Sequence, residues 1–277
     1  MTALHDSQER LVTTFDTPEP IRARVRLHAG GVRVVASDTE HTVVTVTPSR
    51  PDRAGDVDAA ESTTVTLVDG VLDVMAPRDR GLAVVWRPAS VEVLVELPTG
   101  SHLDAETSAG DIEATGRFGE CVLRTSAGNV RADEAARARL RTSAGNVDVR
   151  RASVEADLST SAGNVTLGDS GGRAVLRTSS GDISVSRSAG RLDARTAYGQ
   201  MRVDCVSEGE LTLATGYGTI EVGVLDGTAV RLDVTSDHGQ VRSELAPTQG
   251  RPDDSDRVAM VAARTTYGNV TIRKALS

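Results

Sequence analysis

The feature that most constrains the fold of this chain is an internal repeat of about 18 residues, built around a glycine in units such as T-S-A-G-N-V. A unit this short cannot bury a core by itself, so the copies must stack on one another to exclude water. The repeat therefore predicts a stacked array rather than a globular fold. The glycines that align are Gly110, Gly128, Gly145, Gly163, Gly181, Gly199, Gly218, Gly239 and Gly268.

Apolar residues alternate on both sides of each glycine. In one copy, Cys121 and Leu123 precede Gly128, and Val130 follows it two positions later. This period of two predicts a strand, a tight turn and a second strand, with one face directed inward. The glycine is expected at a positive-φ position of the turn, which a β-carbon would strain.

A hydroxyl side chain stands three positions before every aligned glycine, on the inward side of the strand. Buried hydroxyls need partners, so we expect them to bond to one another and to the amides of the turns. The column comprises Thr107, Thr125, Thr142, Thr160, Thr178, Thr196, Thr215, Ser236 and Thr265.

These patterns predict an all-β fold, a parallel β-solenoid (β-helix) of about nine regular coils in which consecutive coils stack in register. The alternative is an antiparallel meander, whose two-residue hairpins would place Thr125 opposite Val130. Near-identical units and a chain with 2% aromatic residues favour the solenoid, because small side chains suit a narrow interior. The inward residues do not recur every six positions, as a left-handed hexapeptide helix requires, and propeller blades need ~40 residues.

The chain is expected to divide into three segments. Residues 1–17 are predicted to be a flexible N-terminus, and residues 18–100 an irregular β section that caps the solenoid. Residues 101–277 contain the regular repeats, with an exposed loop, A-P-T-Q-G-R-P-D-D-S-D-R, inserted at 246–257.

Charge and composition exclude several classes of function. The net charge is −8 and Lys274 is the single lysine, which argues against a nucleic-acid partner. No run of ~18 apolar residues could span a membrane, and the first residues, M-T-A-L-H-D-S-Q-E-R-L-V, lack the pattern of a signal peptide. A cytoplasmic location is therefore expected. Cys121 and Cys205 fall in different repeats and are predicted to be buried, reduced thiols.

The opening G-G-V-R-V-V-A-S-D and the serial T-S-A-G-N-V units resemble the bacterial β-strand-repeat family of unknown function whose members are called adhesins. The resemblance covers roughly residues 20 to 275. It implies a β-solenoid and no assigned catalytic residues. The chain differs from exported members of that family because it shows no signal sequence or anchor.

Two polar rows beside the glycines are candidates for chemical sites. The residues that follow the glycines, among them Asn129, Asn146 and Asp182, resemble a calcium ladder, but neutral amides supply little charge for a hard cation. A turn-forming role is the better interpretation. Serines of the turns lack a base, since His238 is the one histidine at a repeat turn. The serine row comprises Ser108, Ser126, Ser143, Ser161 and Ser179.

Arginines and aspartates alternate on the outward side of the strands. They predict a solvated mixed-charge face, with an acidic partner such as an anionic polymer or a protein surface as the alternative. The arginine row comprises Arg124, Arg141, Arg177, Arg195 and Arg264, and the acidic row Asp104, Asp157, Asp193 and Asp233.

The later repeats place an aromatic residue directly before the glycine, at Tyr198, Tyr217, His238 and Tyr267. On stacked coils these side chains would form one edge, which is predicted to bind a partner; the alternative is that the rings simply cover the corner of the coil. No catalytic, cofactor-binding or metal-binding residue is predicted.

The sequence thus favours a non-enzymatic scaffold or interaction protein, adhesin-like, with self-association as a further expectation. A carbohydrate-processing solenoid enzyme is the first alternative, but it needs clustered carboxylates and Glu113, Asp148 and Glu221 are scattered. A surface adhesin exported by a non-classical route is the second.

Overall fold

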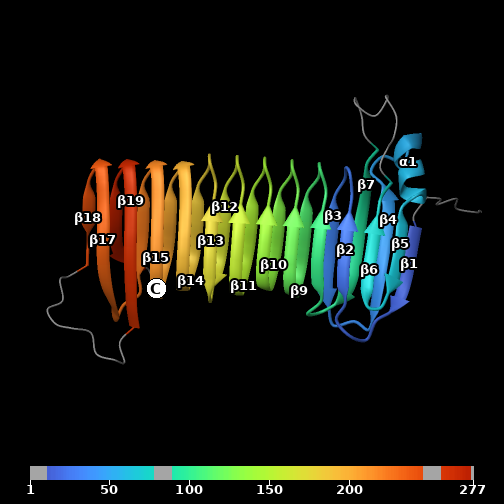
Figure 1. Cartoon of the computed structure of the whole chain (residues 1–277), viewed down its shortest axis with the longest axis horizontal. Helices are drawn as coiled ribbons and strands as arrows, with labels where there is room; N and C mark the ends of the chain where they lie inside the picture. The colour runs from blue at the N-terminus through green and yellow to red at the C-terminus, as the bar shows by residue number, and fades with distance from the viewer. Residues whose placement is uncertain (1–10, 78–88, 246–256, 276–277) are drawn as a thin grey trace, which may run out of the picture. The chain divides into compact units, whose positions relative to one another are not determined.

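The computed structural model describes residues 11–77, 89–245 and 257–275, which belong to two compact units, residues 1–128 and 129–277 (Figure 1). The described part of each unit consists almost entirely of strands, with one helix, α1 (Ala54–Glu61), in the first. The expected all-β, solenoid-like fold is therefore confirmed. The boundary between the compact units falls at residue 128, whereas the sequence placed the start of the regular repeats at 101.

The first unit combines parallel and antiparallel strand pairs. Strand β2 pairs in parallel with both β6 and β8, and β3 pairs in parallel with both β7 and β9. Antiparallel pairs join β1 to β4, β4 to β7, and β5 to β6. The strands are β1 (Leu11–Asp16), β2 (Arg22–Arg26), β3 (Val32–Ser37), β4 (His41–Pro48), β5 (Thr64–Val68), β6 (Val71–Met75), β7 (Val91–Pro98), β8 (His102–Glu106) and β9 (Ile112–Arg124).

The N-terminal segment differs from the prediction. Residues 1–10 lie outside the described residues, but Leu11–Asp16 form β1, in register with β4 from Leu11 opposite Val46 to Asp16 opposite His41. A threonine- and valine-rich run suits a strand with one exposed face, and the antiparallel edge of β4 offers it backbone partners. The segment 1–17 therefore contains an ordered strand.

Helix α1 is held against the sheet by a buried carboxylate. Asp56 is fully buried and accepts hydrogen bonds from Arg50 Nε at 3.1 Å and Arg53 Nη1 at 3.0 Å. Its Oδ1 also accepts the backbone N–H of Ser90 at 3.0 Å, just before β7 begins. Because a buried charge is costly without such partners, Asp56 fixes the helix against the sheet.

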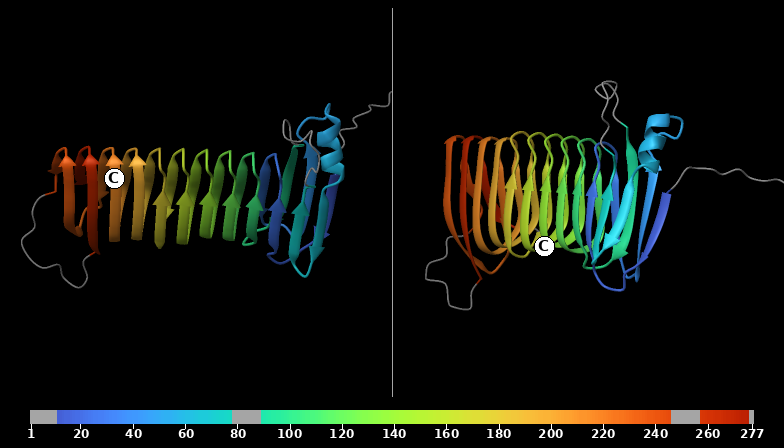
Figure 2. Two further views of the ribbon diagram at one scale, coloured as in Figure 1. Left: turned by 45° about the horizontal axis from the view of Figure 1, so that its top comes forward. Right: turned by 45° about the vertical axis from the view of Figure 1, so that its right-hand side comes forward.

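The second unit is built from parallel strand pairs among its described residues (Figure 2). Each coil consists of a strand, a turn at an aligned glycine, and a second strand. The strands are β10 (Val130–Arg141), β11 (Val147–Ser159), β12 (Val165–Ser170), β13 (Arg173–Arg177), β14 (Ile183–Tyr198), β15 (Met201–Tyr217), β16 (Ile220–Val224), β17 (Thr228–His238), β18 (Val241–Ser243), β19 (Arg257–Tyr267) and β20 (Val270–Lys274).

The core of this unit is a set of aligned aliphatic columns. Leu140 pairs with Leu158, and Leu158 pairs with Leu176, at successive levels of the stack. All three side chains are fully buried, as the period-two pattern predicts. Burying each leucine stabilises the fold by about 1.5–3 kcal/mol, so stacking rather than local structure holds the coils together.

The turns are joined by a row of hydrogen bonds from hydroxyl side chains. The Thr178 hydroxyl donates to the carbonyl oxygen of Gly163 at 3.0 Å, and the same bond recurs along the column. These hydroxyls donate to a glycine carbonyl of the neighbouring coil, so the expectation that they bond to one another and to turn amides is wrong for them. Eight of the nine aligned glycines have the expected positive φ, for example +143° at Gly163, whereas Gly239 in the terminal coil does not.

The order of the coils in space differs from their order in the sequence. Strands β19 and β20 pair with β15 and β16 on one side and with β17 and β18 on the other. Figure 1 accordingly shows β19 between β15 and β17. The Thr265 hydroxyl donates to Gly218 O at 3.0 Å and the Ser236 hydroxyl to Gly268 O at 2.8 Å, which fixes this order. The expectation that consecutive coils always stack is wrong here. The predicted loop 246–257 falls between β18 and β19 in the sequence; residues 246–256 lie outside the described residues, and Arg257 begins β19.

Candidate functional site

The aromatic residues before the turn glycines meet in one column. Strands β14, β15, β17 and β19 each end on one of them. Tyr198 is in register with Tyr217, Tyr217 with Tyr267, and Tyr267 with His238. The structure therefore brings together all four residues that the sequence singled out, although the out-of-order coil places Tyr267 before His238.

We call these four residues the aromatic ladder. The ring centroids of Tyr198 and Tyr217 are 5.1 Å apart, those of Tyr217 and Tyr267 4.8 Å, and those of Tyr267 and His238 4.6 Å. The angles between ring planes are 9°, 5° and 15°. This spacing equals the ~4.8 Å separation of adjacent strands, so the parallel register itself forces the rings to stack.

The ladder is exposed, with 59% of Tyr198, 50% of Tyr217 and 44% of Tyr267 accessible to water. Both faces of the two inner rings, Tyr217 and Tyr267, are covered by their neighbours. The exposed parts of the inner rings are therefore their edges. A flat ligand or a sugar ring could stack only at the two ends, whereas a row of tyrosine edges suits contact with a protein surface.

The polar row after the glycines is occupied by hydrogen bonds between coils. The side-chain oxygen of Asn146 accepts the backbone N–H of Asn164 at 2.9 Å, and the oxygen of Asn164 accepts that of Asp182 at 2.9 Å. The same bond joins Asp182 to Gln200. Within the part of the chain that the structure describes, no group of three or more His, Cys, Asp or Glu residues could hold a metal ion. These oxygens therefore serve the turns.

The serine row meets a histidine at Ser108, whose backbone N–H donates to the carbonyl oxygen of His28 at 3.2 Å; both residues line the groove described below. Ser143, Ser161 and Ser179 are exposed at the turns, while the ring of His238 stacks on Tyr267. Cys121 and Cys205 are free thiols; Cys121 is buried as predicted, whereas Cys205 is only half-buried. Burial raises the pKa of the Cys121 thiol. Cys121 therefore stays protonated near neutral pH and is a poor nucleophile.

One groove lies in the first unit, beside β2, β6 and β8. Its volume is about 1030 Å³, and its described lining includes Arg26, His28 and Glu106. The Nε of Arg26 lies 3.6 Å from Glu106, the one carboxylate of that described lining. A glycosidase needs two carboxylates flanking its substrate, and this lining does not offer them.

A model of the Toastrack DUF4097 family matches residues 25–273. The chain belongs to the Toastrack family. This finding confirms the resemblance read from the glycine repeats, and the family has no established function. No curated protein gives a significant match. The described residues of this Toastrack protein include no helix with the length and apolar character needed to cross a membrane.

Several solved bacterial structures are similar to this Toastrack chain at low identity. A "putative lipid binding protein" from Parabacteroides distasonis ATCC 8503 is 11% identical, with a TM-score of 0.44 and 98% of both chains covered. A "putative adhesin" from Parabacteroides merdae ATCC 43184 is 12% identical, with a TM-score of 0.43 and 98% of both chains covered. A "putative adhesin" from Bacteroides fragilis NCTC 9343 is 12% identical, with a TM-score of 0.37, and covers 97% of this chain and 98% of its own.

The outward charges of the Toastrack coils are paired with one another. Four of the five arginines in the predicted row contact an aspartate of the predicted acidic row, at distances of 2.9 to 3.6 Å. This pairing supports the mixed-charge interpretation of that face, since paired guanidinium groups attract anions less. The pairs are Arg124–Asp104, Arg141–Asp157, Arg195–Asp193 and Arg264–Asp233.

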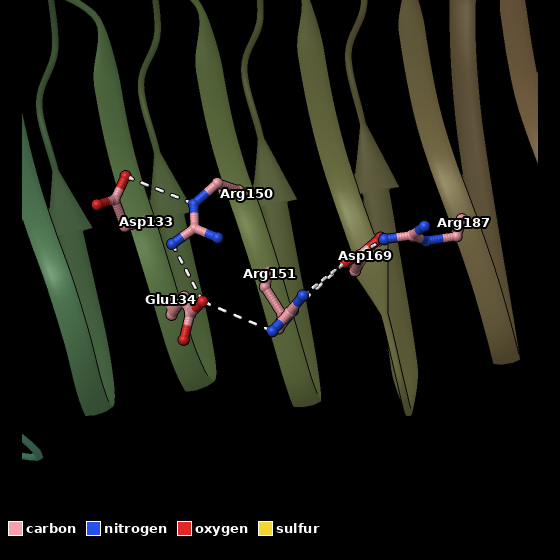
Figure 3. Close-up of polar contacts among 6 residues, drawn as sticks. All are labelled: Asp133, Glu134, Arg150, Arg151, Asp169 and Arg187. Carbon is pink, nitrogen blue, oxygen red and sulfur yellow. Dashed lines mark hydrogen bonds and ion pairs between the residues drawn. The ribbon is translucent and has the colours of Figure 1, made fainter.

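A second charge network, which sequence reasoning missed, runs across β10, β11, β12 and β14 (Figure 3). Arg151 contacts Glu134 at 3.6 Å and Asp169 at 3.1 Å, and Arg187 contacts the other oxygen of Asp169 at 2.8 Å. Hydrogen bonds from Arg187, and then from Arg151, hold the pKa of Asp169 below its usual value. The positions differ by 17 or 18 residues, the length of one coil, which is the signal that could have revealed them. Arg150 extends the network to Asp133.

Proposed function

We propose that this Toastrack protein is a non-enzymatic β-solenoid scaffold that binds a protein partner along the aromatic ladder. The observation that carries the proposal is the alignment of three tyrosines and His238 at 4.6–5.1 Å, with each tyrosine exposed by 44% or more. Tyrosine is enriched at protein interfaces because it supplies a large contact area at a low entropic cost.

The finer architecture, a parallel solenoid of about nine coils, belongs to this proposal. It is supported by the parallel register within the second unit and by the repeated hydroxyl-to-glycine bonds. A coil tied to its neighbours in this way holds the ladder rings at fixed spacing. A preorganised surface loses little entropy on binding, which is the property a scaffold needs.

The test replaces the three tyrosines together, Tyr198→Ser, Tyr217→Ser and Tyr267→Ser, and repeats an affinity purification from the native cell. Serine already occupies the equivalent position at Ser180, in register with Tyr198, so the fold should tolerate the change. We expect the proteins captured by the wild type to be lost. Capture that is unchanged would overturn the role of the ladder.

The matched control changes exposed apolar residues away from the ladder. Val154 is 47% exposed and Met260 is 47% exposed, close to the values for the tyrosines. The double variant Val154→Ser/Met260→Ser should capture the same proteins as the wild type. Equal losses in both variants would mean that capture depends on general surface hydrophobicity, which also contradicts the proposal.

A cytoplasmic location is part of the proposal, supported by the free thiols of Cys121 and Cys205, since unpaired cysteines suit a reducing compartment. Fractionation of the native cell tests it. Recovery in the soluble cytoplasmic fraction is expected, and recovery at the cell surface would favour the surface adhesin instead. An anionic polymer is a less suitable partner because the arginine row is largely paired.

Self-association is the remaining part of the proposed scaffold role.

A further inference from the structure

Strand β17 lies at the end of the second unit and has a neighbour, β19, on one side among the described residues. Its inward residues are consequently exposed. Leu232 is 37% accessible, whereas Leu211 and Val261, which occupy the same column, are 0% and 1% accessible. Val241 of β18 is 50% accessible against 0% for its register partner Val270. The terminal coil thus presents the core columns of the stack to water.

The backbone of β17 is also directed at this free side. Between other coils, the N–H of the inward threonine donates to a carbonyl of the next coil, as Thr178 N does to Arg195 O at 3.0 Å. Ser236 is the equivalent residue of β17, and the even-numbered residues of that strand share its parity. Because the N–H and C=O of one residue in a parallel strand face the same neighbour, these groups point away from β19. An unpaired edge of this kind is a template for another strand.

We propose that this edge binds a second copy of the chain, with β17 pairing antiparallel to β17 of the partner about a two-fold axis at Leu232. The inference rests on the proposed scaffold function and names the partner for its self-association. In this register Val230 of each copy lies opposite Val234 of the other copy, and Leu232 lies opposite Leu232. The exposed apolar positions of both edges therefore cover one another, and the residues with free backbone groups face each other.

Charge favours this register over the registers that are shifted by one residue. With the axis at Leu232, Arg231 lies opposite Asp233 of the other copy, and the pair forms twice. Moving the axis by one residue places either Arg231 or Asp233 opposite its own copy, which like charges disfavour. Arg231 has no ion pair within the described residues, and Asp233 contacts exposed Arg264 at 3.6 Å, a contact that leaves it 67% accessible. Both charges are therefore available to a partner.

The experiment measures the mass of the full chain by sedimentation from about 1 to 100 µM. We expect the wild type to move from the 29.0 kDa monomer toward twice that mass as concentration rises. Arg231→Asp should raise the dissociation constant about tenfold or more, because it turns two attractive pairs into two repulsive ones. The double variant Arg231→Asp/Asp233→Arg restores opposite charges in the same register and should recover the dimer.

Arg177→Asp is the matched control, since Arg177 is an exposed outward arginine within the array, and it should dimerise like the wild type. A monomer throughout the range would overturn the inference, as would a dimer that Arg231→Asp leaves intact. A double variant that stays monomeric would overturn the register. Assemblies that keep growing beyond the dimer would indicate head-to-tail pairing and contradict the two-fold. A monomeric wild type whose tyrosine variant still loses its captured proteins would refute this inference and leave the ladder proposal standing.

Discussion

At the scale of single residues, the turn glycines carry two constraints at once. Gly163 has a φ of +143°, and a β-carbon there would collide with the carbonyl oxygen of Gly145 in the adjacent coil. That same carbonyl accepts the Thr160 hydroxyl at 2.9 Å. A side chain at the glycine would therefore strain its own backbone and disturb the bonds between two coils.

We expect Gly163→Ala to lower the stability of the protein by about 3 kcal/mol or more, from backbone strain and steric conflict together. Gly227→Ala is the control, because Gly227 also has a positive φ, +77°, but no atom lies within 4 Å of its added carbon. It should cost about 1–2 kcal/mol, from strain alone. Urea unfolding midpoints compare the two, and equal losses would contradict the packing argument.

Many of these residue-level features could be predicted from the sequence. The period of two identified the inward columns, and glycine chemistry predicted the turn conformation. The acceptor of each threonine hydroxyl could not be predicted, because the pattern shows which side chains are buried but not which backbone group of the next coil lies closest. Thr178 and Gly163, 15 residues apart, meet only after the register is fixed.

At the scale of elements, neighbouring strands are joined by ion pairs between side chains on their outward face. Asp169 of β12 is the centre of one such network and bonds to Arg151 on β11 and Arg187 on β14. Glu134, Arg151, Asp169 and Arg187 occupy one column, six positions after the turn glycines, and are register partners in adjacent coils. Sequence reasoning considered the outward columns before the glycine and therefore overlooked these pairs. Adding one coil length to each charged position would have found them.

This network predicts a pH dependence. The pKa of Asp169 is lowered in the folded state by its arginine partners, so its carboxylate stabilises the fold above its unfolded pKa of about 3.9. That contribution is lost as the pH falls through the lower, folded value. Asp169→Asn should therefore cost up to about 1 kcal/mol at neutral pH, and the difference from the wild type should shrink as the pH falls below the unfolded pKa of about 3.9.

Asp237→Asn is the control, since Asp237 is exposed on β17 and forms no ion pair with another described residue. It should match the wild type in chemical denaturation at neutral pH and in acid. A difference for Asp169→Asn that persists undiminished in acid would show that its cause is not the charge of the carboxylate.

At the scale of the whole molecule, both compact units contain a coil that is out of sequence order. In the first, β2 lies between β6 and β8; in the second, β19 lies between β15 and β17. The sequence could not reveal this order, because every coil carries the same aliphatic, hydroxyl and glycine columns and can stack on any other. Similar columns specify how coils stack, but they do not specify which coils are neighbours.

The order of the last coils can be tested by engineered disulfides in a background that lacks Cys121 and Cys205. Tyr217 and Tyr267 are register partners, as are Tyr267 and His238, so cysteines at either pair should cross-link. Tyr217 and His238 are separated by an intervening strand, which places them ~9.6 Å apart, beyond the ~7 Å that a disulfide spans. Intact-mass measurement after mild oxidation distinguishes the pairs, with Tyr198→Cys/Tyr217→Cys as the positive control. If coils stacked in the order of the sequence, the Tyr217–His238 pair would cross-link and the Tyr217–Tyr267 pair would not, which is the reverse of the result that the parallel register requires.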